Sequence, residues 1–346
     1  MQSTDLIAGR LRARWRATEY VFWAAALASF FVLPERHLIL TEIAWLGLFA
    51  LSLDLILGYA GIISLGHAAF FGLGSYVAAL LAKHAIIPEP ALALLVSGLA
   101  AAALGFITSF LVLRGSDLTR LMVTLGIALI MREIANQLPD ITGGADGLQG
   151  VRIGPILGLF EFDIFGHVGY AYCLTVLFLL FLLARRIVHS PFGLSLRATK
   201  ANPLRSSSIG IPVNARLVAI YTLAAAYAGV AGALLAQTTA FASLEVFSFE
   251  RSADLLLMLI LGGPGYLYGG LIGAVVFKFV QDWLAALTPQ YWQFWIGALL
   301  VVIVLVGRER MGNWILAARA FGRRTGRRIL CSIIPPALFA AIGGKR

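Results

Sequence analysis

The sequence predicts an all-α fold, a polytopic integral membrane bundle of about ten transmembrane helices with both ends of the chain in the cytoplasm. Of its 346 residues, 60% are apolar or aromatic and only 13% are charged, whereas a soluble domain is about half apolar and a quarter charged. The mean hydropathy is +0.88. Spans of roughly 20 residues each leave no room for a separate soluble catalytic domain. The two cysteines also exclude a disulfide framework.

Charge-poor apolar runs locate the predicted helices along the chain. The stretch 255–307 is divided at its glycines and prolines, and weaker runs complete the set. The predicted helices cover residues 20–34, 38–57, 63–83, 91–113, 118–138, 168–184, 217–239, 252–263, 269–287 and 290–307.

Two glycine-rich stretches interrupt this series. Gly58–His67 carries three glycines, and Gly262–Gly265 adds a proline. Non-helical backbone at membrane depth is tolerated only where protein or a water-filled cavity satisfies its polar groups. We therefore expect a solute pathway at these interruptions.

Small residues recur at every fourth position in several predicted helices. Such spacing places them on one helix face, where backbones approach closely in lipid. The predicted ridges are Ala60, Ser64, Ala68 and Gly72; Ala225, Gly229 and Ala233; Ala228, Gly232 and Ala236; and Gly265, Gly269 and Gly273.

The orientation follows from Lys and Arg. Of the 27 basic residues, the predicted inner segments and their borders hold four near the start, two at 114–120, six in 185–216 and nine in 308–346. The opposite side gathers acidic residues, so an even number of spans fits the charge distribution. Topology thus accounts for the net charge of +10, and nucleic-acid binding is not needed to explain it.

Polar side chains within predicted spans are costly, so each needs a reason. Asp54 lies just before the first interruption, and two roles stay open for it: a link to the pathway, or a buried hydrogen bond to the interruption. His67 fits a structural hydrogen-bonding role better than a proton carrier. Together with Gly58, Gly61 and Ser64, these residues form the predicted pathway set.

Enzyme signatures are missing from the sequence, so we predict no catalytic residue, no metal site and no cofactor bound by this chain. It has no Gly-x-x-x-x-Gly-Lys-Ser/Thr loop, no His-Glu-x-x-His pair and no Gly-x-Ser-x-Gly turn. Ser64 and His67 lie three apart, which leaves an intramembrane hydrolase as a remote alternative. A passive channel is another.

The longest polar stretch between spans is the predicted inner loop 185–216. Ser195–Lys200 is expected to form a short helix that ends near Asn202-Pro203, and Ser206–Ile209 another that ends at Gly210. A loop of this size is usually functional or a linker. Short helices on the inner face are suited to transmit motion from a soluble partner.

Several motifs in order resemble one known family, the larger permease type of bacterial ATP-binding-cassette importers for branched-chain amino acids. Each motif alone is weak, but together they cover about residues 40–308 and are specific. They are Leu53–Gly61, Ser64–Tyr76, Thr142–Leu148, Ser190-Pro191-Phe192-Gly193 with Ile209-Gly210, Ala228–Leu234 and Leu261–Gly265.

The resemblance implies a heterodimer with a second, related permease, two cytoplasmic ATPase subunits that use ATP-Mg, and a periplasmic solute-binding protein. It also implies that the loop with Ser190–Gly193, Ile209 and Gly210 docks onto an ATPase. The outer turn Thr142-Gly143-Gly144 is the expected contact for the binding protein. Two departures from the family pattern stand out. Asp54 stands where many relatives carry Asn, and Lys200 and Arg205 replace acidic, alanine-rich sequence in the docking loop.

The expected organisation is a basic cytoplasmic segment 1–19, a permease domain 20–307 and a basic cytoplasmic tail 308–346 that contacts anionic lipid. We expect a multi-pass protein of the bacterial inner membrane that takes up leucine, isoleucine or valine by alternating access. A urea or short-amide importer is the alternative substrate class. The solute itself, and the identities of the partner proteins, do not follow from the sequence.

Overall fold

The computed structural model describes residues 17–306 except 157, 159 and 164. In this part of the chain the regular structure is helical, with two isolated β-bridges. The longer helices are α2 (Ala17–Val32), α3 (His37–Leu53), α4 (Ala68–Lys83), α5 (Pro90–Val112), α6 (Asp117–Gln137), α8 (His167–Val188), α9 (Pro191–Ala201), α11 (Val213–Thr239), α12 (Phe249–Gly262), α13 (Leu267–Leu287) and α14 (Trp292–Val306). Shorter elements are η1 (Pro34–Arg36), η2 (Asp54–Gly58), α7 (Pro139–Thr142), η3 (Gly144–Asp146), α10 (Pro203–Ser208) and η4 (Leu244–Phe247).

Each predicted helical segment contains a helix among the described residues, which confirms the all-α fold. Five helical segments are long and apolar enough to cross a membrane, namely Pro34–Gly58, Pro90–Val112, His167–Val188, Val213–Thr239 and Leu267–Leu287. The shorter apolar helices α2 and α4 accompany them. The predicted basic tail 308–346 lies outside the described residues, as does 1–16 of the predicted N-terminal segment.

One prediction fails at the start of α4. The helix predicted from residue 63 begins at Ala68. The chain from Tyr59 to His67 is not helical. Ala60 and Ser64 therefore do not share a helix face with Ala68 and Gly72, and the ridge predicted from their spacing is wrong.

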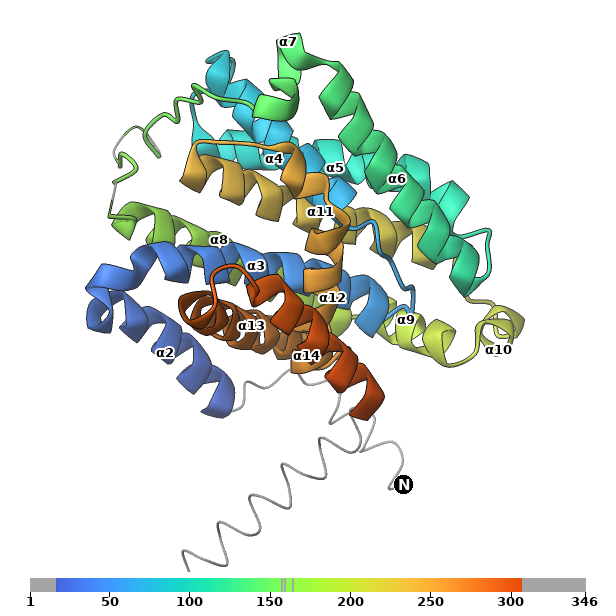
Figure 1. Ribbon diagram of the computed structural model, residues 1–346. Helices are drawn as coiled ribbons and strands as arrows, with labels where there is room; N and C mark the ends of the chain where they lie inside the picture. The colour runs from blue at the N-terminus through green and yellow to red at the C-terminus, as the bar shows by residue number, and fades with distance from the viewer. Residues whose placement is uncertain (1–16, 157, 159, 164, 307–346) are drawn as a thin grey trace, which may run out of the picture. The chain divides into compact units, whose positions relative to one another are not determined.

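The chain divides into two compact units, 1–280 and 281–346, and the features that follow lie in the first. Its centre is α11, which packs against α5, α4 and α3 (Figure 1). Small residues allow this close packing: a Cβ on Gly229 would overlap the Cβ of Ala101, and a Cβ on Gly232 would overlap the carbonyl of Phe71. The two predicted small-residue ridges of α11 are therefore helix-packing surfaces.

Glycines also bring α12 and α13 together. A Cβ on Gly262 would overlap the carbonyl of Gly269, and one on Gly273 would overlap the carbonyl of Met258. The helices can approach so closely only because these positions lack side chains. On its other side, α13 meets α3, where a Cβ on Gly270 would lie 3.0 Å from the carbonyl carbon of Ala50.

Candidate functional site

The first predicted interruption is present and begins as a change of helix type. After α3 the chain makes the single π-helical turn η2 (Asp54–Gly58), a feature that is frequent at functional sites. The N–H groups of Ala60 and Ile62 then donate to the Ile56 carbonyl, at 3.2 and 3.1 Å. Gly61 has φ +76°, a backbone conformation that favours glycine, and the chain stays non-helical up to His67.

The second predicted interruption is also present, and Asp54 joins the two. Helix α12 ends at Gly262 and α13 begins at Leu267. The Asp54 side chain is fully buried, and its Oδ1 accepts a hydrogen bond from the Gly265 N–H at 2.6 Å. A carboxylate–amide bond of this kind is stronger than a neutral one. Of the two roles left open for Asp54, the buried hydrogen bond is present, and it goes to the second interruption.

Gly58 lies where the two interruptions meet. A Cβ at this position would stand 2.5 Å from the Gly265 backbone nitrogen and would overlap the Asp54 carboxylate. There is no room here for a side chain, so the position requires glycine, whereas its backbone angle does not. Asp54 and Gly58, which the sequence placed in one set, are indeed in contact distance of each other.

The C-terminal part of the first interruption is held by hydroxyl groups from other helices. The Leu65 N–H donates to Thr124 Oγ1 of α6 at 3.2 Å, and the Ala68 N–H donates to Ser252 Oγ of α12 at 3.1 Å. Neither Thr124 nor Ser252 was foreseen from the sequence. Both are buried, and a lone hydroxyl residue in an apolar helix carries no signal that distinguishes this role.

Ser64 and His67 are both buried, at 1% and 0% exposure, but they do not form a hydrogen-bonded pair in the described structure. His67 Nε2 lies 2.9 Å from Ser52 Oγ. Within the described residues, Ser64 Oγ and His67 Nδ1 have no hydrogen-bond partner. The Ser/His arrangement that a hydrolase would need is therefore not formed, and the structural role expected for His67 fits its contact with Ser52.

The predicted inner loop contains the two expected short helices, α9 and α10, both longer than predicted toward their starts. Pro191 opens α9, where its missing N–H costs nothing, and the Phe192 ring lies 5.2 Å from the Arg216 guanidinium carbon. Gly193 allows the loop to fold back tightly, since a Cβ there would overlap the Val188 carbonyl. The Ser190 hydroxyl donates to the Ile187 carbonyl at 2.6 Å.

Ile209 and Gly210 end α10 at an exposed tip. Ile209 is 70% exposed and Leu204, one helical turn before, is 81% exposed. Gly210 has φ +87° and nothing lies within 4 Å of its Cβ position. The tip thus presents two large apolar side chains to a partner, of which Leu204 was not foreseen.

Two cations of α9 reach the first interruption, a contact that the sequence did not reveal. Lys200 Nζ donates to the Gly58 carbonyl at 2.7 Å and to the Leu57 carbonyl at 3.3 Å. The Arg197 guanidinium carbon lies 5.2 Å from the centre of the Tyr59 ring. The loop residues and the pathway residues, predicted as separate sets, are therefore in direct contact.

The predicted outer turn is rigid. The Thr142 hydroxyl donates to the Leu138 carbonyl at 2.7 Å and contacts the Ala135 carbonyl, and the Gly144 N–H donates to Thr142 Oγ1 at 3.3 Å. Thr142 and Gly144 are buried and Gly143 is partly so, while Ala145 and Asp146 beside them are exposed. Thr142 thus shapes the turn, and its exposed neighbours form its accessible surface.

A family of sequences described as "Branched-chain amino acid transport system / permease component" matches residues 37–304. The chain belongs to this permease family. It is 27% identical over 276 residues to the high-affinity branched-chain amino acid transport system permease protein LivM of Escherichia coli, and 28% identical over 277 residues to LivM of Salmonella typhimurium. Each match covers 74% of this chain and 64% of the LivM protein, less than two thirds of its length.

A third relative belongs to an archaeon. The probable branched-chain amino acid transport permease protein LivH of Methanocaldococcus jannaschii is 28% identical over 240 residues, which are 66% of this chain and 73% of LivH. No solved structure matches the chain. The family and the apolar helices make the chain a multi-pass membrane protein of the bacterial inner membrane, and its relatives are transport permeases.

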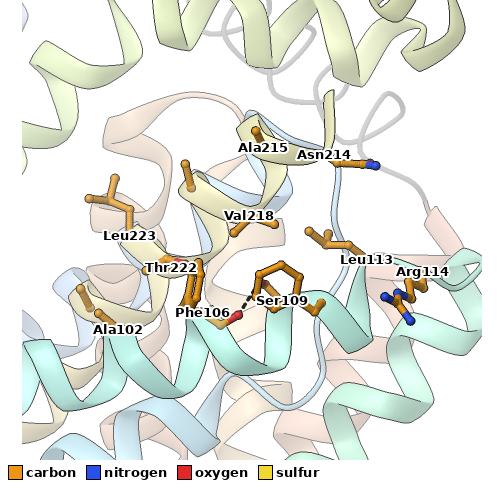
Figure 2. Close-up of a pocket in the computed structure, with 13 residues that line it drawn as sticks. Ala102, Phe106, Ser109, Leu113, Arg114, Asn214, Ala215, Val218, Thr222 and Leu223 are labelled. Atoms are coloured by element: carbon orange, nitrogen blue, oxygen red, sulfur yellow. Dashed lines mark hydrogen bonds between the residues drawn. The ribbon is translucent and has the colours of Figure 1, made fainter. Parts of the chain in front are cut away.

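A groove elsewhere on this permease lacks the polar character of the interruptions. It has a volume of about 950 Å³ and lies between α5 and α11, with Arg114 and Asn214 near one end and Ala102 near the other (Figure 2). The Ser109 hydroxyl in it is already bonded to the Phe106 carbonyl at 2.6 Å. None of the predicted site residues lines this groove, so the candidate site is the pair of interruptions.

The described residues offer no metal site. Within 17–306, apart from the three positions left out, no three His, Cys, Asp or Glu side chains are grouped so that they could hold a metal ion. The groups at the interruptions include backbone N–H and C=O groups, hydroxyls, the Asp54 carboxylate, the His67 imidazole and the two cations of α9.

Proposed function

We propose that this chain is the transmembrane permease subunit of an ATP-binding-cassette importer that takes up leucine, isoleucine or valine by alternating access. The observation that carries the proposal is the meeting of two interrupted helices inside the bundle, joined by the Asp54–Gly265 hydrogen bond at 2.6 Å. A zwitterionic solute must exchange its hydration shell for fixed polar groups, and interrupted helices supply such groups at membrane depth. The relatives are branched-chain amino acid transport permeases, which supports the solute class.

Ser64 is the pathway residue that the geometry favours. Its hydroxyl is buried within the interruption and, among the described residues, lacks a hydrogen-bond partner. A buried hydroxyl without a partner costs about 1–3 kcal/mol, which a polar solute group passing the interruption would offset. We propose that Asp54, Gly58, Gly61 and His67 shape this passage and that Ser64 contacts the solute.

The proposed assembly contains partners that this chain does not include. They are a second homologous permease, two ATPase subunits that hydrolyse ATP-Mg, and a periplasmic binding protein. The exposed tip of α10, with Leu204 and Ile209, is the proposed ATPase contact. The outer turn with Ala145 and Asp146 is the proposed binding-protein contact.

Uptake by the whole importer tests the proposed function. The permease is reconstituted in proteoliposomes with its partner permease, ATPases and binding protein, and uptake of labelled leucine, isoleucine, valine and urea is measured. We expect ATP-dependent uptake of the amino acids. Uptake of urea alone would replace the solute class, and ATP-independent flux would favour the channel.

Cysteine labelling tests the proposed ten-span topology. Single cysteines at exposed positions of 185–216 should be reached by an impermeant thiol reagent only from the cytoplasmic side, and cysteines in 140–165 only from outside. Labelling of the inner loop on intact cells would contradict cytoplasmic ends of the chain.

Energy coupling through the inner loop is tested at Gly210. Gly210→Val strains a backbone with φ +87° at a place where nothing lies within 4 Å of the Cβ, so the change is confined to the loop tip. We expect ATP hydrolysis to continue while uptake falls. Gly150→Val is the matched control, because Gly150 has φ +75° and equally open surroundings in the outer segment. Equal uptake per ATP in both variants would exclude the α10 tip as the docking site.

A further inference from the structure

Helix α9 is anchored in the protein on one face and reaches the first interruption from another. Gly193, Leu196 and Thr199 are buried at three-residue intervals, which places them on one face of the helix. Arg197 and Lys200 are also three residues apart, and they directly follow the buried Leu196 and Thr199. A movement of α9 would therefore carry both cations with it.

The Lys200 ammonium group binds the end of a helix. Leu57 and Gly58 are the last residues of η2, and the N–H groups of the turn that follows, those of Ala60 and Ile62, both donate to Ile56. The last carbonyls of a helix need partners from outside it, and a cation near a helix C-terminus is favourable. Lys200 supplies both the hydrogen-bond donor and the positive charge, through hydrogen bonds of 2.7 and 3.3 Å.

Two further contacts fit the interruption to α9. The Arg197 guanidinium lies over the Tyr59 ring at 5.2 Å, within the range of a cation–π interaction. Gly61 makes room for the stem of Lys200, because a Cβ at Gly61 would lie 3.0 Å from Lys200 Cγ. Residues 57–61 thus contact α9 through hydrogen bonds, a cation–π interaction and close packing.

The same segment is tied at its other end to the second interruption. Asp54, in η2, accepts the Gly265 N–H at 2.6 Å. A continuous set of hydrogen bonds therefore runs from α9, through Lys200 and η2, to the junction of α12 and α13. Hydrogen-bond networks and packed side chains of this kind can carry coupling between two sites.

We propose that Lys200 and Arg197 hold α9 against the interrupted segment 57–61, so that the inner loop and the solute passage move as one body during transport. We call this pair of contacts the latch. In this role both are positioning residues: neither contacts the solute, and they act through the carbonyls of Leu57 and Gly58 and the ring of Tyr59. The inference deepens the proposed function and rests on it.

The first test measures coupling in the complete importer. Lys200→Met keeps the aliphatic stem and removes the charged donor. We therefore expect leucine uptake per ATP hydrolysed to fall about tenfold or more, a change that corresponds to a coupling free energy of about 1.4 kcal/mol. Binding-protein-stimulated ATP hydrolysis should persist. Lys200→Arg, which retains the donor, should restore most of the ratio. Lys83→Met, an exposed lysine at the end of α4, is the matched control.

The second test asks whether α9 and the segment move together. Cysteines replace Tyr59 and Arg197 in the Lys200→Met background, and a short reversible thiol cross-linker joins them. We expect the cross-link to raise the uptake per ATP toward the wild-type ratio and its cleavage to lower it again. A cross-link that stops transport would show that the two elements must separate, and would overturn the proposal.

The outcomes separate the latch from the proposed function. If the wild-type importer takes up no branched-chain amino acid, the proposed function fails. If it does, and Lys200→Met has the same uptake per ATP as wild type and Lys83→Met, the latch alone fails. Membrane levels and ATP hydrolysis of each variant distinguish a loss of coupling from a loss of folded protein.

Discussion

The two interruptions meet the same physical demand in different ways. The first, from Gly58 to His67, is long, and hydroxyl and ammonium groups from α6, α12 and α9 bond to its backbone or to that of Ala68, the residue that follows it. The second, between Gly262 and Leu267, is short, and close approach of glycine-lined backbones surrounds it, with one carboxylate bonded to Gly265. Both lie in a membrane protein, where non-helical backbone must find its partners within the protein.

The difference predicts different consequences of substitution. At the first interruption, polar side chains from other helices bond to the backbone. Similar side chains can replace them, and a passing solute or a moving loop can take their place. Backbones in direct contact allow no added atom. The proposal therefore places motion and solute contact at the first interruption and structural support at the second.

The largest expected effect is at Gly58, where the two meet. Gly58→Ala places a Cβ 2.5 Å from the Gly265 nitrogen and against the Asp54 carboxylate. Breaking a buried hydrogen-bond network is among the most destabilising kinds of substitution, whose common range is about 0.5–3 kcal/mol, so we expect lost uptake and a clearly lower thermal midpoint in detergent.

Gly126→Ala is the matched control for that substitution. Gly126 lies within α6, and nothing stands within 4 Å of its Cβ position. Alanine should stabilise this helix by about 0.5–1 kcal/mol. A similar thermal midpoint for Gly58→Ala and Gly126→Ala would contradict the close meeting of the two interruptions.

A smaller effect on uptake per folded molecule is expected from Gly262→Ala, which affects the second interruption alone. Gly262→Ala would drive a methyl group into the Gly269 carbonyl, and overpacking of this kind costs typically about 1–3 kcal/mol. We expect reduced thermal stability, with uptake per folded molecule less affected than by Gly58→Ala. Detergent melting curves and uptake normalised to membrane level measure the two effects. Greater damage to uptake than to stability would place the second interruption in the pathway itself.

Much of this fold follows from the sequence, because apolar runs and glycine-proline breaks are local signals. The helices and both interruptions lie where the residues predict them. The start of α4 does not, because Gly61 adopts φ +76° and the N–H groups of Leu65 and Ala68 bond to distant hydroxyl groups that no local pattern indicates. Those hydroxyl groups belong to Thr124 and Ser252.

The candidate site was less predictable for the same reason. Asp54, Gly58 and Gly61 stand out in the sequence as a charge and glycines at an interruption. Lys200 is one basic residue among several in a polar loop, and its bond to Gly58 spans 142 positions of the chain. Nothing in the local pattern indicates a contact over that separation.

At Ser64, two substitutions separate space from chemistry in the first interruption. Ser64→Leu adds bulk at a site that is 1% exposed, so we expect uptake to fall at least tenfold with a loss of about 1–3 kcal/mol in stability. Ser64→Ala removes a hydroxyl that has no partner within the described residues and should leave stability equal or slightly higher. A raised KM for leucine in Ser64→Ala would support solute contact, whereas an unchanged KM would remove it.

Asp54→Asn should be milder than Ser64→Leu. The amide oxygen can still accept the Gly265 N–H, so the link at 2.6 Å is retained, while the charge is lost. Hydrogen bonds to charged groups contribute about 1.5–3 kcal/mol and neutral ones about 1, which limits the expected loss to about 0.5–2 kcal/mol. Asp54→Leu, which has no acceptor, is the contrasting variant. Equal melting temperatures for the Asn and Leu variants would show that the Asp54–Gly265 bond does not join the interruptions.

The smallest effect is expected for His67→Gln. His67 Nε2 lies 2.9 Å from Ser52 Oγ, and a glutamine amide can make the same hydrogen bond, so the start of α4 should keep its support. We expect uptake close to that of wild type, because the hydrogen bond to Ser52, worth about 1 kcal/mol, is retained. His67→Leu, which cannot bond to Ser52, should be the less stable of the two. A peptidase activity that the wild type has and His67→Gln lacks would favour the hydrolase, and a large loss of uptake in His67→Gln at normal membrane level would assign His67 to the solute passage.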